Sequence, residues 1–179
     1  LKQVFVDFWL ATFLFIKRND FALFYEGQYI PVISIELIDL LYHEPAKFQI
    51  KAFNVSGVRL ELFNRYRALI QKSTVESINQ QSFVETIKPF LSFYKQLPPY
   101  TQNTKRLASA TLRLRNAIAN ATDPEKTFFE DFPKALGYHD IEKLRNDEEM
   151  LQNYVDKLQD TIRELRTAQD ELFNRIEAF

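Results

Sequence analysis

The C-terminal stretch, residues 141–179, reads IEKLRNDEEMLQNYVDKLQDTIRELRTAQDELFNRIEAF and contains neither glycine nor proline. Its apolar residues recur three and four positions apart, which is the 3.5-residue period of helices that pair side by side. The pattern predicts one long coiled-coil-type helix over residues 139–179. We define its helix-pairing seam by the apolar members of both heptad registers: Ile141, Leu144, Leu151, Val155, Leu158, Ile162, Leu165, Leu172 and Ile176.

A helix of this length needs another helix beside it. At 1.5 Å per residue, the 39 residues of 141–179 make a rod of about 58 Å. A compact chain of this size has a radius of gyration of only about 16 Å. The partner of the seam is therefore an earlier helix of the same chain, a second copy, or a missing part of a longer parent protein. β-Branched residues alternating with leucine favour a parallel pair of copies, whereas Tyr154, Ala168 and Phe173 widen the stripe as in a bundle.

The remainder of the chain predicts a mainly α fold with a small N-terminal β element. Residues 2–17 are apolar on nearly every side, which predicts a buried core helix, and they fall short of the roughly 20 residues that a membrane span requires. Aromatic runs on either side of Gly27 predict a hairpin, and residues 47–53 alternate like a third strand. We divide the chain into an α/β N-terminal subdomain (1–72), a helical subdomain (73–138) and the long helix (139–179).

Several helix ends carry local signals in the sequence. Ser34 is placed to cap a helix that ends near His43. The Ser82-x-x-Glu85 spacing is that of a capping box, which predicts a helix from residue 82 to about residue 96. Asp123 followed by proline predicts another helix start, and Gly137 predicts a left-handed helix end.

Charge is distributed unevenly along the chain. The formal net charge of −1 combines +6 over residues 1–121 with −7 over residues 122–179. The span 86–121 contains no acidic residue, and aromatic side chains lie among its cations: Lys88, Lys95, Lys105, Arg106, Arg113 and Arg115. Cations attract phosphate and aromatic rings stack on bases, so this span is a candidate for nucleic-acid binding. The alternative is a core helix whose basic face meets the acidic C-terminal third.

No catalytic pattern emerges from the residue types and spacings. The chain has no cysteine, which excludes disulfides and thiolate chemistry and is typical of a reducing, cytoplasmic compartment. His43 and His139 lie in different elements without a metal ligand at helical spacing. Glycine occurs only at isolated positions, so no phosphate-binding loop is present. The sequence predicts no enzyme activity, no cofactor and no metal.

A family resemblance rests on two stretches. The first is FALFY (21–25) followed by Gly27 and Ile30-Pro31, and the second is PPYT (98–101) followed by DPEKTFFEDFPKALG (123–137). Together they resemble the accessory helical regions of large bacterial ATP-binding proteins, some of which belong to phage-defence or restriction-type systems. Because no nucleotide-binding loop matches, the resemblance implies no site residue here. It implies a regulatory or assembly segment whose ATPase lies outside these residues.

These observations favour a non-catalytic protein–protein interaction or assembly module within a larger intracellular protein. The module is expected to work by presenting an apolar helical seam to a partner. A nucleic-acid-binding module that uses residues 86–121 is the alternative function.

Overall fold

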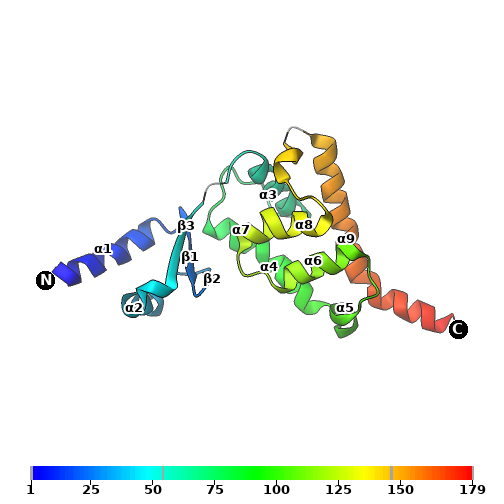
Figure 1. Ribbon diagram of the computed structural model, residues 1–179, viewed down its shortest axis with the longest axis horizontal. Helices are drawn as coiled ribbons and strands as arrows, with labels where there is room; N and C mark the ends of the chain where they lie inside the picture. Colours follow the sequence, from blue (N-terminus) through cyan, green and yellow to red (C-terminus); the bar gives the residue numbers. More distant parts are fainter. Residues whose placement is uncertain (1, 54, 146, 179) are drawn as a thin grey trace.

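The computed structural model describes residues 2–53, 55–145 and 147–178 of the chain (Figure 1). The predicted mainly α fold, with a small β element near the N-terminus and a long C-terminal helix, is confirmed. The elements are α1 (Lys2–Ile16), β1 (Phe21–Tyr25), β2 (Gln28–Ile30), α2 (Ile35–His43), η1 (Pro45–Lys47), β3 (Phe48–Ala52), α3 (Val58–Leu69), α4 (Gln80–Gln96), α5 (Pro99–Asn103), α6 (Ser109–Ala119), α7 (Pro124–Lys126), η2 (Thr127–Asp131), α8 (Phe132–Leu136), η3 (Ile141–Leu144) and α9 (Glu148–Glu177).

The three strands form an antiparallel sheet in the order β2-β1-β3, with the most buried strand in the centre. Leu23 of β1 lies opposite Ile30 of β2 and Ile50 of β3. Because side chains alternate across a strand, Phe21 and Leu23 share one face. They form a small core with residues from α1 and the segment before α2. Figure 1 shows the sheet between α1 and α2 on one side and the helical body on the other.

A second and larger core fills the helical body. Its centre is aromatic: Phe63 and Tyr66 of α3 are fully buried and contact the ring of Phe128. Phe128 and Phe132 enter this core from the π-helical turn η2 and from α8. The sequence division groups residues 58–69 with the sheet, whereas α3 packs into the helical core because its inner face meets these rings.

The local signals for helix ends agree with the structure in most places. Ser34 accepts a hydrogen bond from the Leu37 amide, Asp123 caps α7, and Gly137 is left-handed with φ of 92°. The start of α4 differs from the prediction. Asn79 is the N-cap and Ser82 is its reciprocal partner, so the capping box lies three residues earlier and α4 begins at Gln80. Asn79 is the better cap because its side chain reaches the Ser82 amide.

The predicted buried environment of the N-terminal helix is wrong. Phe5 is 70% exposed and Phe8 is 71% exposed, whereas Leu14 is fully buried. The apolar composition of residues 2–17 indicates a helix whose side chains gain free energy when they are buried. It contained no information on whether residues of this same chain cover that helix.

The long C-terminal helix is shorter than the predicted 139–179. Ile141–Leu144 form the separate 3-10 turn η3, and α9 begins at Glu148. Two aspartates explain the break, because Asp140 accepts from the Glu142 amide and Asp147 accepts from the Met150 amide. Such side chains compete with the helical hydrogen bonds of the backbone and thereby start new helices. The 30 residues of α9 span about 45 Å.

Candidate interaction surfaces

The upstream half of the helix-pairing seam is covered by the chain itself. Leu151, Val155, Leu158 and Leu165 of α9 are buried, and α9 packs against α3, α5, α6 and α8. Glu164 reinforces this contact, because its carboxylate accepts hydrogen bonds from the Ala108 amide at 2.8 Å and from the Thr111 hydroxyl. This half of the seam is therefore part of the core.

Two buried tyrosines join α9 to α3 inside this core. The hydroxyls of Tyr66 and Tyr154 are hydrogen-bonded to each other. Tyr66 also donates to the carbonyl oxygen of Phe128 at 2.9 Å. Burial raises the pKa of both phenols, because a phenolate has no water to solvate it there. The pair is therefore a neutral polar contact within an aromatic cluster.

The other seam residues lie in three different environments. Ile141 and Leu144 are buried in η3, outside the long helix. Ile162 is half-buried beside a groove that Phe90 and Phe93 also line. Leu172 is half-buried and Ile176 is 60% exposed. The structure therefore does not bring the predicted seam into one continuous surface.

The downstream end of α9 extends past the helical body. In Figure 1 this end, drawn in red, projects away from α5 and α6 towards the C-terminus. Phe173 is 50% exposed and lies in the same heptad stripe as Leu172 and Ile176. The three side chains continue the apolar repeat that is buried upstream. They form a surface that we name the α9 end.

The six cations of the basic span serve different purposes. Arg115 is buried and donates to the carbonyl oxygens of Thr101 and Thr104, at 2.9 and 2.7 Å. Arg113 donates through Nε to the Ala135 carbonyl oxygen at 2.9 Å. These two arginines are committed to backbone groups. Arg113 is nevertheless exposed, as are the other four, which form no ion pair within the described part of the chain: Lys88, Lys95, Lys105 and Arg106.

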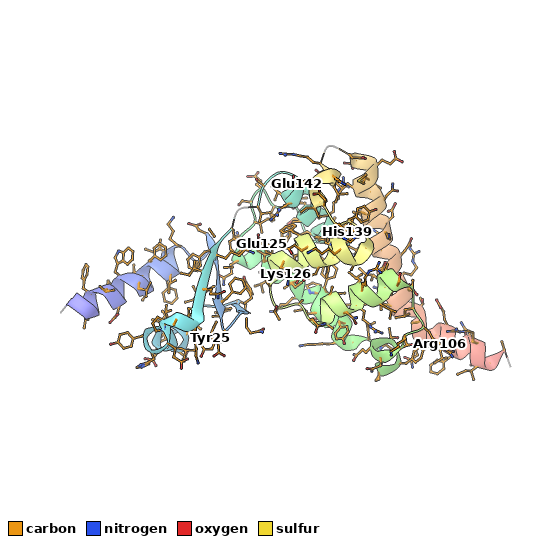
Figure 2. All side chains as sticks on the ribbon, in the orientation of Figure 1. Tyr25, Arg106, Glu125, Lys126, His139 and Glu142 are labelled. Atoms are coloured by element: carbon orange, nitrogen blue, oxygen red, sulfur yellow. The ribbon has the colours of Figure 1, made fainter. Side chains whose placement is uncertain are left out.

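Two aromatic residues of the same span, Phe90 and Phe93, take part in internal packing. Phe90 is buried beside Tyr66 and Phe132. Phe93 is half-buried, with the guanidinium of Arg166 over its ring at 6.0 Å from the centroid. The rings therefore belong to the packing between α4, α3 and α9. The loop that carries Arg106 lies near the outer end of α9 (Figure 2).

A charged joint that the sequence analysis missed connects the sheet to the helical body. Glu125 of α7 is 9% exposed, and its carboxylate lies 3.0 Å from Lys51 Nζ and 3.7 Å from Arg59 Nη1. Asp123 lies 3.6 Å from the same lysine nitrogen. The residues come from β3, α3 and the start of α7, which are distant in sequence, so no local pattern indicates the joint. Figure 2 labels Glu125 in this region.

Two hydrogen bonds that involve the backbone of β2 also connect the sheet to the helical body. The Tyr29 amide donates to the Thr122 carbonyl oxygen, and Gln80 donates to the Ile30 carbonyl oxygen at 3.0 Å. Burial raises the pKa of Tyr29 to about 12. Polar contacts thus attach the sheet to the body, together with Phe53, which follows β3 and packs its ring against Phe83 of α4.

In the part of the chain that the structure describes, the titratable groups are not arranged as a metal centre. Within the described residues, no group of three or more His, Asp or Glu side chains is placed to hold a metal ion. His43 lies 3.7 Å from Asp39 on the exposed side of α2, and His139 is exposed after α8. Among the helices of the described ranges, none combines the length and the hydropathy that a membrane crossing requires.

Comparison with known proteins adds no relative to this description. No family model matches the chain, and no curated protein and no solved structure is significantly similar to it.

Proposed function

We propose that this chain is a non-catalytic assembly module of a larger cytoplasmic protein, of the ATP-binding defence type that the sequence resembles, and that it acts through the α9 end. One observation carries the proposal: a single apolar heptad stripe is covered by the chain upstream and left uncovered downstream. Leu165 is fully buried, and Ile176, eleven residues later in the other register, is 60% exposed.

The energetic argument favours a helical partner at this end. Burying an exposed Phe or Ile side chain stabilises a contact by about 1.5–3 kcal/mol. Phe173 and Ile176 thus offer a substantial gain to a second helix laid along the stripe. Isoleucine alternating with leucine favours a parallel arrangement of two copies. In a parallel pair, each seam residue lies next to its own counterpart.

Two single-cysteine variants test this arrangement directly, because the natural chain contains no cysteine. Ile176→Cys places a thiol on the stripe, and Asn174→Cys places one on the opposite face of α9. Under mild oxidation, we expect a covalent dimer from Ile176→Cys and monomer from Asn174→Cys, as read on a non-reducing gel. Equal dimer yields from the two variants would contradict the proposal.

A matched charge pair extends the test to the unlinked protein. Ile176→Glu is expected to weaken association through the α9 end, because a charge cannot be buried in an apolar contact. Asn174→Glu adds the same charge on the outward face and is expected to have no effect. Sedimentation velocity over a range of concentrations measures both variants. Unchanged association in Ile176→Glu would remove the α9 end as the assembly surface.

Nucleic-acid binding is the second candidate function. Its support is the set of exposed cations without ion-pair partners, of which Lys105 and Arg106 are adjacent. Binding that rests on phosphate contacts weakens steeply with salt. Lys105→Glu/Arg106→Glu is expected to abolish such binding in a fluorescence-anisotropy titration with single-stranded DNA. The control is Lys17→Glu/Arg18→Glu, which changes the net charge by the same amount at a pair of cations in the N-terminal part of the chain.

A further inference from the structure

Helix α1 carries a second apolar surface, at the opposite end of the molecule from the α9 end (Figure 1). Phe5, Trp9, Phe13 and Ile16 follow one another four, four and three positions apart, so they form one stripe along the helix, which we name the α1 stripe. Trp9 is 59% exposed and Ile16 is 72% exposed. The Trp9 and Phe13 rings stack with their centroids 5.7 Å apart, which fixes the outline of the stripe.

A groove runs between α1 and α2, next to the α1 stripe. Val6 and Leu10 form its wall on α1, and α2 contributes the opposite wall. The apolar residues of that second wall are Ile38, Leu41 and Tyr42. Val6 and Tyr42 are each 53% exposed at the edge of the groove, and Asp7 and His43 are the polar members of its lining.

The area of this surface is that of a stable interface. Aromatic side chains offer about 150–250 Å² each, so the exposed parts of the α1 stripe, Val6 and Tyr42 amount to roughly 700 Å² of apolar area. The largest apolar patch on a typical monomer is about 300–600 Å². A standard protein interface buries about 800 Å² on each partner. The surface is therefore large enough to hold two molecules together.

The chemistry of α1 distinguishes between possible occupants. A helix that lies in a lipid surface keeps a polar face towards water. By contrast, α1 is apolar on both flanks, because Val4, Phe8 and Phe15 are exposed on the side away from the stripe. Asp7 is the only ionisable residue of the span 4–16, so α1 offers a partner a mainly apolar surface. A second copy supplies both an apolar ridge and a groove whose walls are mainly apolar.

We propose that two copies of this chain pair through α1 and α2, with the α1 stripe of each copy packed against the α1–α2 groove of the other. Such a contact is isologous: the same patch serves on both sides of a two-fold axis. It buries Trp9 and Tyr42 at the centre, and large aromatic residues of this kind dominate the energy of interfaces.

Trp9 provides the test, because it is the single tryptophan of the chain. In the Ile176→Glu chain, which lacks association through the α9 end, its fluorescence is expected to shift to shorter wavelength as the concentration rises, in parallel with a doubling of the mass by light scattering. A constant mass with constant emission overturns the proposal. A doubled mass without any shift in emission overturns it too, because the copies then pair elsewhere.

Matched variants on the two flanks of α1 locate the contact. Phe5→Glu lies on the stripe and is expected to raise the dimer dissociation constant at least about 100-fold, because an apolar side chain is lost and a charge is introduced in both copies. Phe8→Glu makes the same change on the other flank and is expected to leave the constant within about threefold. Equal effects of the two substitutions would overturn the placement. Circular dichroism confirms that both variants keep their helices.

Two further measurements separate the remaining outcomes. Neutral phosphatidylcholine vesicles are expected to leave the Trp9 emission unchanged, and a blue shift on adding them at low protein concentration would make lipid the occupant and overturn the proposal. Ile176→Glu is expected to leave the Trp9 shift intact. Failure of the α1 contact and failure of the α9 end are therefore distinguishable.

Discussion

Single buried polar side chains determine how the elements of this protein meet. The Tyr66–Tyr154 pair joins two helices that are 88 positions apart in sequence, and Arg115 holds the turn after α5 through two carbonyl oxygens. Neither contact follows from a local pattern. Arg115 lies in the same acid-free span as the exposed cations, and only its burial shows that it has a structural role.

The tyrosine pair predicts a loss of stability at alkaline pH. An unfolded tyrosine ionises near pH 10, whereas burial holds the pKa of Tyr154 above that value in the folded state. Below about pH 10 both states are protonated and the stability is complete. Above it the folded state binds more protons, so the free energy of unfolding falls by up to about 1.4 kcal/mol per pH unit for each such tyrosine.

Tyr154→Phe isolates the contribution of one phenol. Tyr66 keeps its acceptor at the Phe128 carbonyl oxygen in this variant. We expect a shallower decline between pH 10 and 12, by about one proton, in urea unfolding measured at a series of pH values. Identical slopes for the variant and the natural protein would show that Tyr154 is not buried in its neutral form.

A comparison of Arg115 with Lys105 distinguishes a cation that stabilises the fold from one that is free to bind a ligand. Arg115→Ala removes charge-assisted hydrogen bonds to two buried carbonyl oxygens, so we expect a loss of about 1.5–3 kcal/mol in the free energy of unfolding. Lys105→Ala is exposed and should change stability by less than about 0.5 kcal/mol. Chemical denaturation compares the two. An unchanged free energy of unfolding in Arg115→Ala would contradict the structural role that the contacts of Arg115 indicate.

At the scale of the element, α9 is one helix with two kinds of surroundings. Its heptad pattern predicted that the helix exists and which of its faces is apolar. The pattern did not predict at which residue the other helices stop covering the apolar face of α9. That point depends on α3, α5, α6 and α8, which are far away in sequence. The same reason explains α1, whose composition is that of a buried helix although most of its apolar side chains are exposed. Several helix ends were predictable because capping involves residues within one turn, but the starts of α4 and α9 were not placed correctly.

The two halves of α9 are expected to respond differently to the same substitution. Leu158 is fully buried, so Leu158→Ala should cost about 2–5 kcal/mol through lost transfer energy and the cavity that it leaves. Leu172 is half-buried, and Leu172→Ala should cost less than about 1 kcal/mol in the monomer. Denaturant unfolding at low protein concentration measures both. Equal costs would mean that the α9 end is covered in the monomer.

At the scale of the whole molecule, two apolar cores are joined by polar contacts and by the packing of Phe53 on Phe83. The core of the sheet rests on few fully buried side chains, with Leu14 and Leu23 at its centre, whereas that of the body contains the aromatic cluster. The joint between the cores depends on the ion pairs of Glu125 and on hydrogen bonds of β2. The sequence predicted the sheet and the helices, but not this division, which follows from contacts between distant residues.

The smaller core is expected to open before the larger one. Amides of β1 and β3 should exchange hydrogen faster than those of α3 and α9, because local opening is governed by the apolar area that it exposes. Glu125→Gln weakens the ion pairs with Lys51 and Arg59 and should widen this difference. Hydrogen-exchange mass spectrometry reads both regions in one sample. Uniform protection across the chain would show a single cooperative unit.

The positions of the chain termini in Figure 1 have a geometric consequence. α1 and the end of α9 point away from each other, so a copy joined to a neighbour at one extremity keeps its other extremity available. If like ends join, two kinds of two-fold axis alternate along the row, and the row stays open where these axes do not intersect. Growth then proceeds as an open string, whose average length rises with concentration. Blocking either extremity reduces the string to isolated pairs.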